Sequence, residues 1–187
     1  MMCTPSEVIK NTESDAENPD KPLTHAGWLE KTQPNFNWKF DLLCDRMQSA
    51  ENAGLIIRTA LGLGIQNIYF LSSIFKWNAK KLKKLSRSAN QYVNIQSIES
   101  LSEIDLSTYS NIVSLEYSQK SKSIYSNRLE GSTLLILGSE YDGIQDYLLN
   151  LSHEVYHIPL VGEQSSINVA QAFSGAMVYF NANRIQK

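Results

Sequence analysis

Cysteine is scarce in this 187-residue chain, which has only Cys3 and Cys44. A disulfide framework is therefore not expected, and Cys44 is interpreted as a small buried hydrophobe within a strand. The sequence also lacks an apolar run as long as the ~20 residues that a membrane-spanning helix needs. It does not open with a charged segment followed by an apolar one, as a leader would. From these absences we expect a cytoplasmic protein.

Aliphatic residues and periodicity are also scarce in the first part of the chain. Residues 1–24 carry mainly acidic charge and three prolines, which predicts a disordered or loosely docked N-terminal arm. Residues 25–187 are then long enough for one domain with a substantial core. Its first stretch, 25–39, carries aromatic side chains and is interpreted as an irregular entry segment.

From residue 40 onward, apolar runs of strand length alternate with helical stretches. Predicted strands are 40–44, 67–71, 92–98, 111–116, 133–137 and 155–158. Predicted helices are 53–63, 79–88, 145–151 and 168–185, with a weaker one near Leu101. Strands separated by helices predict an α/β fold in which a mostly parallel sheet is flanked by helices.

Three segments rich in polar residues and glycine, 52–60, 137–143 and 158–169, stand where a strand meets a helix. Ligands of α/β domains bind beyond the carboxyl ends of parallel strands. Three such junctions, spread over more than a hundred residues, therefore predict one composite site.

Each segment also has an ordinary structural explanation. Asn52 is expected to cap the following helix, as are Ser166 and Asn168 for the last one. Arg58 could be a solvated surface residue, and Glu140 a solvated acid in a turn. Capping does not explain the length of the polar loop 162–168.

Taken together, the three segments resemble the motifs of the SpoU family of RNA 2′-O-ribose methyltransferases, within the SPOUT superfamily. The first carries Asn-x-Gly-x-x-x-Arg-Thr-Ala at 52–60, and the second Leu-Gly-x-Glu-x-x-Gly at 137–143. The third carries Ile-Pro-Leu at 158–160, followed by Ser-Ile-Asn-Val at 166–169. The resemblance covers roughly residues 40–183.

The resemblance implies S-adenosyl-L-methionine as methyl donor, and tRNA or rRNA as substrate. It also implies a C-terminal deep trefoil knot and a homodimer whose active site borrows from the partner subunit. We expect the dimer surface on the face of the last helix that carries small residues. In this family, backbone from the knotted loops holds the adenosine, which corresponds here to Leu115, Gly138, Ile158, Leu160 and Ser166.

The implied catalytic residues are Arg58, Glu140, Ser166 and Asn168. A guanidinium rarely gives up a proton, so we interpret Arg58 as gripping the target phosphate in a forked contact rather than as a general base. Glu140 is expected to hold Arg58, while Ser166 and Asn168 orient the ribose.

RNA contacts are expected from Asn52, Arg58 and a basic cluster between residues 76 and 87. The cluster includes Lys80, Lys81, Lys84 and Arg87, together with an aromatic side chain that could stack on a base. A charge run of this kind is also typical of a solvated helix face, and both interpretations stay open.

Two functions other than RNA methylation are compatible with parts of the sequence. His153-Glu-Val-Tyr-His157 has the letters of a zinc-peptidase motif, but that chemistry needs a helix, and this segment favours a strand. No metal site is therefore expected. A SPOUT-fold RNA-binding module without catalysis is the second alternative.

Overall fold

The computed structural model describes residues 39–73, 84, 93–126 and 128–185. The predicted N-terminal arm 1–24 lies outside these residues. So do the entry segment up to residue 38 and, apart from Lys84, the predicted helix 79–88. No helix among the described residues is both long enough and apolar enough to span a membrane.

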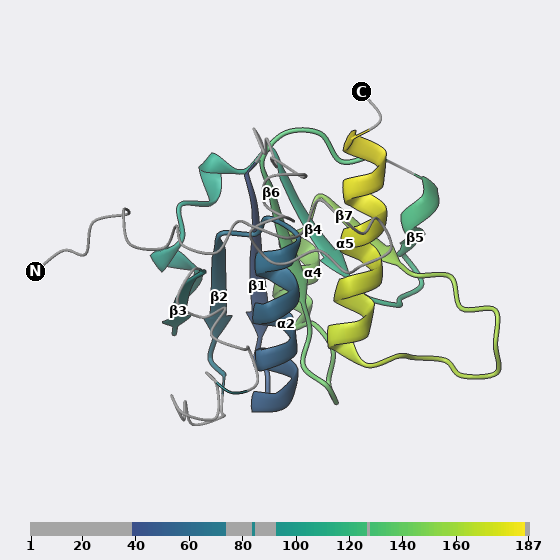
Figure 1. Cartoon of the computed structure of the whole chain (residues 1–187), viewed down its shortest axis with the longest axis horizontal. Helices are drawn as coiled ribbons and strands as arrows, with labels where there is room; N and C mark the ends of the chain where they lie inside the picture. Colours follow the sequence, from purple (N-terminus) through teal and green to yellow (C-terminus); the bar gives the residue numbers. More distant parts are fainter. Residues whose placement is uncertain (1–38, 74–83, 85–92, 127, 186–187) are drawn as a thin grey trace, which may run out of the picture. The chain divides into compact units, whose positions relative to one another are not determined.

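The described part is an α/β structure built on a seven-stranded sheet (Figure 1). In chain order the strands are β1 Phe40–Asp45, β2 Asn67–Leu71, β3 Asn94–Ile98, β4 Asn111–Leu115, β5 Lys122–Ser123, β6 Thr133–Leu137 and β7 Glu154–His157. Their spatial order is β3-β2-β1-β6-β4-β7-β5, and every pairing is parallel. The predicted parallel α/β architecture is therefore confirmed.

The described residues also form three α-helices and three short 3-10 turns. The helices are α2 Ala50–Gly62, α4 Asp146–Leu151 and α5 Val169–Ile185, and the turns are η3 Leu101–Glu103, η4 Leu106–Thr108 and η5 Ile124–Ser126. Helices α2 and α5 pack against each other along one face of the sheet (Figure 1). The weak helix expected near Leu101 is replaced by the two turns η3 and η4.

Alternation along the central strands divides the core into two layers. In β1, Leu42 and Cys44 point toward the layer that contains α2 and α5, whereas Leu43 points into the layer that contains α4. All five residues of β6 are buried, as expected for a strand covered on both faces. Cys44 is a buried free thiol, as predicted.

The sequence placed six of the seven strands with ends correct to within one or two residues. It missed β5, which has only two residues and pairs with β7 at the sheet edge. So short a strand shows no alternation, and its position depends on a neighbour that comes later in the chain.

The capping predictions have mixed outcomes. Asn168 caps α5, because its Oδ1 accepts from the backbone N–H of Ala170 at 2.9 Å and of Gln171 at 3.3 Å. Asn52 does not cap α2, which is a correction. The helix begins earlier, at Ala50, and Ser49 is its cap, with Oγ accepting from the N–H of Asn52 at 3.2 Å. The Asn52 side chain is thereby released for a different partner.

Candidate functional site

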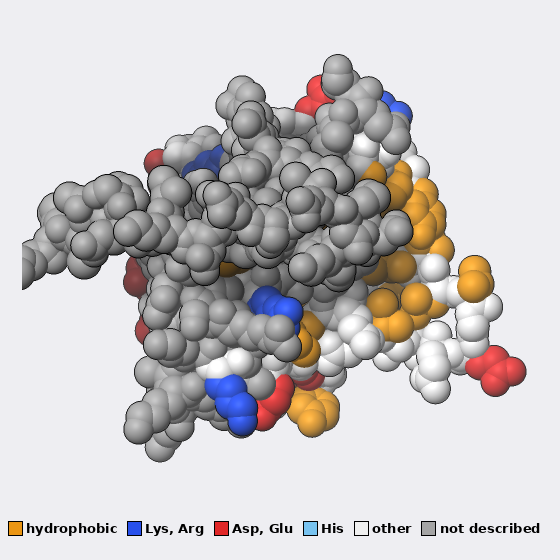
Figure 2. Space-filling model, viewed as in Figure 1, with side chains coloured by type: hydrophobic (Ala, Val, Ile, Leu, Met, Phe, Trp, Pro, Cys, Tyr) orange, Lys and Arg blue, Asp and Glu red, His pale blue; other side chains and the backbone are white. Residues whose placement is uncertain are grey.

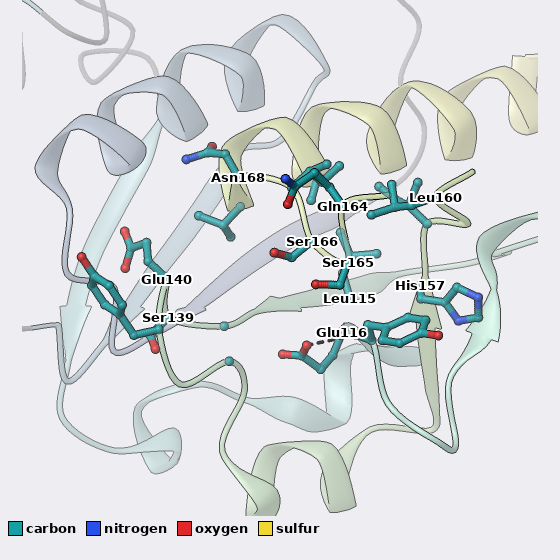
Figure 3. A pocket seen from close by; sticks show the side chains of 18 of the residues that line it. Leu115, Glu116, Ser139, Glu140, His157, Leu160, Gln164, Ser165, Ser166 and Asn168 are labelled. Carbon is teal, nitrogen blue, oxygen red and sulfur yellow. Dashed lines mark hydrogen bonds between the residues drawn. The ribbon is translucent and has the colours of Figure 1, made fainter. Parts of the chain in front are cut away.

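The loops that follow β4, β6 and β7 enclose a pocket with a volume of 730 Å³ (Figure 3). All three strands end at the same edge because they are parallel. Apolar side chains of Leu115, Ile158 and Leu160 line the pocket beside polar groups from the loops 138–143 and 162–168. This size and mixed lining are typical of a small-molecule site.

Glu140, in the loop between β6 and α4, connects this loop to the start of α2. One carboxylate oxygen accepts from the backbone N–H of Gln48 at 2.9 Å. The other accepts from the backbone N–H of Ser49 at 3.0 Å and from Asn52 Nδ2 at 2.8 Å. These donors belong to the first turn of α2 and its approach, where N–H groups lack helical partners. Glu140 is therefore fixed at a helix N-terminus.

Asn52 extends this connection to the third segment. Its Oδ1 accepts from Asn168 Nδ2 at 2.9 Å, while its Nδ2 donates to Glu140. Asn168 stands at the start of α5 and lines the pocket (Figure 3). The three motif segments are thus joined through Glu140, Asn52 and Asn168, and they converge as the sequence predicts.

The hydrogen bonds also determine the charge of Glu140. Burial on its own raises the pKa of this carboxyl. The donors Asn52, Gln48 and Ser49 outweigh burial, because they stabilise the ionised form, and the pKa lies below its usual range. The pocket rim therefore carries a carboxylate that stays ionised at neutral pH.

A tight turn forms the side of the pocket next to β6. Gly143 has a φ of 67°, and its carbonyl oxygen accepts from the N–H of Ser139 at 3.1 Å. A Cβ atom on Gly138 would lie 2.4 Å from the carbonyl carbon of Gly143, so only glycine fits there. Glu116, just beyond β4, holds the turn from the other side, with Oε2 accepting from the N–H of Ile144 at 3.0 Å.

Every residue expected to hold the donor lines this pocket: Leu115, Gly138, Ile158, Leu160 and Ser166. Three of the four expected catalytic residues, Glu140, Ser166 and Asn168, line it as well.

Arg58, the fourth, does not line the pocket. It is exposed on α2, and no hydrogen bond or ion pair joins it to another described residue. Arg58 stands six residues beyond Asn52, which places it about 9 Å further along the helix axis and on another side of the helix. Glu140 was expected to hold Arg58. Within this chain it binds the start of α2 and not Arg58.

The residues expected to contact RNA have different environments. Asn52 is only 8% exposed and is fully engaged with Glu140 and Asn168. Lys84 is exposed. The other three members of the basic cluster named above, Lys80, Lys81 and Arg87, lie outside the described residues.

The zinc-peptidase motif lies in and just before β7 rather than on a helix. His153 Nδ1 accepts from the backbone N–H of Ile112 at 3.3 Å, and His157 Nδ1 is 2.9 Å from Ser121 Oγ. The described residues contain no group of three His, Cys, Asp or Glu side chains able to hold a metal ion. The strand removes the one-turn spacing that the peptidase chemistry requires.

Some lining residues lie outside the three predicted segments and were missed, among them Glu116, Tyr117 and His157. Glu116 and Tyr117 follow β4 directly, so the rule that ligands bind beyond strand ends could have found them. The predicted strand 111–116 included Glu116, whereas β4 ends at Leu115.

Known proteins with similar sequences are RNA methyltransferases by name. The model of the SpoU rRNA Methylase family matches residues 39–178. An uncharacterized tRNA/rRNA methyltransferase of Synechocystis sp. is 25% identical over 143 residues, which cover 75% of this chain and 52% of that protein.

Solved structures share the fold. The SpoU methyltransferase AviRb from Streptomyces viridochromogenes, in complex with AdoMet, has a TM-score of 0.72 at 21% identity, covering 85% of this chain and 65% of AviRb. A TrmH/SpoU tRNA modifying enzyme of A. aeolicus has the same TM-score of 0.72 at 19% identity, covering 85% of this chain and 82% of that one. The chain thus spans about half the length of the curated relative and under two thirds of AviRb.

The first prediction concerns the close approach at Gly138. Gly138→Ala should lower the free energy of unfolding by about 1–3 kcal/mol, because the added methyl meets backbone that cannot move aside. Gly162→Ala is the matched control, since a Cβ there has no atom within 4 Å, and it should change stability by no more than about 0.5 kcal/mol. Urea unfolding of both variants decides the matter. Equal stabilities would show that the turn is not tightly packed.

The second prediction concerns pH. The lowered pKa of Glu140 means that its carboxylate stabilises the folded state above the unfolded pKa, and that this contribution is lost as pH falls through the folded pKa. The stability difference between wild type and Glu140→Gln should therefore be full at neutral pH and shrink below about pH 4.5. Urea unfolding across this range measures it, with the exposed Glu99→Gln as control. A difference that does not depend on pH would contradict the assignment.

Proposed function

The chain belongs to the SpoU rRNA Methylase family, and we propose that it transfers a methyl group from S-adenosyl-L-methionine to a ribose 2′-hydroxyl of tRNA or rRNA. One observation carries the proposal. Glu140, Asn52 and Asn168 join three segments distant in sequence at the rim of one pocket. Action on cellular RNA is in keeping with a cytoplasmic location.

The pocket suits an adenosyl ligand. Leu115, Ile158 and Leu160 offer apolar surface to a planar base, and the exposed backbone of the surrounding loops offers hydrogen bonds. Gly138, which has no side chain, lets a ligand approach the backbone closely. When bound, S-adenosyl-L-methionine would supply a methyl group on a sulfonium, which is a good leaving group.

The protein's remaining task is to align the ribose hydroxyl. We assign this orientation to Ser166 and Asn168, with Asn52 and Glu140 as positioning residues. Asn168 is held from both sides, because its Nδ2 donates to Asn52 and its Oδ1 caps α5. Orientation by groups fixed in this way can contribute several kcal/mol to the rate.

Arg58 is proposed to act at the rim of the pocket of a second copy of the chain. Its exposed position on α2, away from its own pocket, supports a contribution across a homodimer interface. There the planar guanidinium would grip the phosphate next to the target ribose in a forked contact. Basic residues of the 76–87 cluster, including Lys80, Lys81, Lys84 and Arg87, are proposed to bind RNA further out.

The small-residue face of α5 is only partly exposed. Ala170 and Ala176 are buried within the chain, Ala172 is half-buried and Gly175 is exposed. Figure 2 shows hydrophobic side chains gathered on the side of the molecule where α5 lies. Tyr125 and Val178, which are 60% and 59% exposed, are large apolar side chains on η5 and α5. We propose that this surface takes part in the homodimer.

The trefoil knot is part of the same proposal. Strand β7 lies between β4 and β5 in the sheet, although it follows both in the chain. The chain therefore passes from one side of the β7 position to the other and back, from β4 to β5 and then to β6, before β7 is formed. This order supports threading of the C-terminal segment through a loop, a rare topology in proteins.

An RNA-binding module without catalysis is the alternative. Its pocket would have no need of the fixed Glu140–Asn52–Asn168 connection, so the observed hydrogen bonds favour the enzyme. The two functions differ in one measurement, because the module would bind the donor or RNA and transfer no methyl group.

The third prediction tests the reaction. Incubation with methyl-labelled S-adenosyl-L-methionine and RNA from cells that lack this protein should label tRNA or rRNA at a ribose 2′-oxygen, located by 2′-O-methyl mapping. Asn168→Ala should lower kcat/KM by about 10²-fold, because the acceptor loses its alignment. Glu99→Gln, an exposed acid just beyond β3, serves as the control variant. Donor binding without transfer to any cellular RNA would favour the module, and methylation of a base would contradict the ribose assignment.

The fourth prediction tests the sharing of Arg58 between subunits. Arg58→Ala and the double variant Ser166→Ala/Asn168→Ala should each be nearly inactive. Co-refolding the two in equal amounts should restore about one quarter of wild-type activity, because half of the dimers are mixed and each mixed dimer has one complete site.

With both parents inactive, no restoration would show that Arg58 acts within its own protomer, and an active Arg58→Ala would show that Arg58 is not needed. Arg58→Lys gives the complementary test of the forked contact. It should remain strongly impaired with saturating RNA and donor, because an ammonium cannot make two parallel hydrogen bonds. Near-normal turnover of this variant would rule the forked contact out.

A further inference from the structure

The pocket has an unbalanced charge. Three carboxyl side chains line it, those of Glu116, Glu140 and Glu163, and its lining among the described residues includes no lysine or arginine. Glu116 and Glu140 come from two different loops, those after β4 and β6 (Figure 3). A ligand there meets a negative potential.

This charge matters because the two adenosyl species of the proposed reaction differ by one unit. S-adenosyl-L-methionine carries a sulfonium, an ammonium and a carboxylate, so its net charge is +1 at neutral pH. The product S-adenosyl-L-homocysteine carries a neutral thioether in place of the sulfonium, so its net charge is zero. Their shapes differ by one methyl group only. An electrostatic preference is therefore the simplest way to tell them apart.

The three acids are not equivalent. The charge of Glu140 is offset by three donors and by the positive end of the α2 dipole. Glu163 is exposed, so solvent screens it. Glu116 is half-buried and accepts only two backbone N–H groups, those of Tyr117 at 2.9 Å and Ile144 at 3.0 Å. No ion pair joins Glu116 to a cationic side chain in the described part of the chain.

We propose that Glu116 gives the pocket a preference for the cationic methyl donor over its neutral product, an inference that rests on the proposed function. One unit charge several ångströms away, in a partly solvated pocket, changes affinity by roughly five- to tenfold. Glu116 would thus favour release of the spent product and its replacement by fresh donor, without touching the reacting atoms.

The experiment separates charge from shape. Glu116→Gln keeps an acceptor oxygen for the N–H of Ile144 and removes the charge. Calorimetry would measure the Kd of three ligands for both proteins: the donor, the product, and sinefungin, whose amine restores a positive charge at the sulfonium position. The variant should bind the donor and sinefungin about fivefold more weakly, and the product with nearly unchanged affinity.

Salt provides a second readout. The donor-to-product preference of the wild type should fall toward that of Glu116→Gln at about 1 M NaCl, where the screening length is about 3 Å. Glu99→Gln, an exposed acid at the end of β3 and at the opposite edge of the sheet, controls for overall charge and should alter none of the three affinities.

Equal weakening of all three ligands, or none, would overturn the inference and leave Glu116 as a support for the turn at Gly143. If Glu116→Gln fails to fold, the salt dependence of the wild type still tests the charge preference, because Glu163 is screened and Glu140 is offset by its donors. A wild-type donor-to-product ratio that does not change with salt would count against the inference. A wild type that binds no adenosyl ligand would instead overturn the proposed function itself.

Discussion

The arrangement of the site depends on the Glu140 carboxylate, which accepts two backbone N–H groups and one side-chain amide at the start of α2. Leaving a partly buried donor unpaired costs about 1–3 kcal/mol, so three donors converging on one acceptor strongly favour a single position of the loop after β6. That position puts Asn52 within reach of Asn168, and through it fixes the start of α5. This contact therefore fixes two of the loops that line the pocket against each other.

The parallel sheet explains why so few interactions suffice. Strands β4, β6 and β7 point in the same direction, so their loops emerge together without further guidance. What remains is to fix the loops against each other. Glu116 reaches across from β4 to the N–H of Ile144, and Gly138 lets the turn at Gly143 pack directly on the end of β6. The carboxylates of Glu116 and Glu140 and the two glycines thus hold the loops in place.

Sequence reasoning succeeded where the signal was local. The apolar run of β6 identified a strand buried on both faces, and Asn168 was recognised as a helix cap. It failed where two candidates competed, since Ser49 and not Asn52 caps α2. It was also silent on the Asn52–Asn168 hydrogen bond, whose partners lie 116 residues apart. Such contacts follow from tertiary packing, which a pattern of residue types does not contain.

The acidic lining of the pocket and the position of Arg58 outside it are consistent with the proposed function. The described lining of the pocket is acidic, and an acidic pocket attracts a sulfonium but repels a phosphate. RNA carries a phosphate at every nucleotide, so its backbone must be held by cationic groups outside this pocket. Arg58 is exposed and lies outside its own pocket, on the helix whose first turn is anchored to Glu140. Placing the cation on a separate surface lets a neutral ribose hydroxyl approach the donor while the charged backbone stays at the rim.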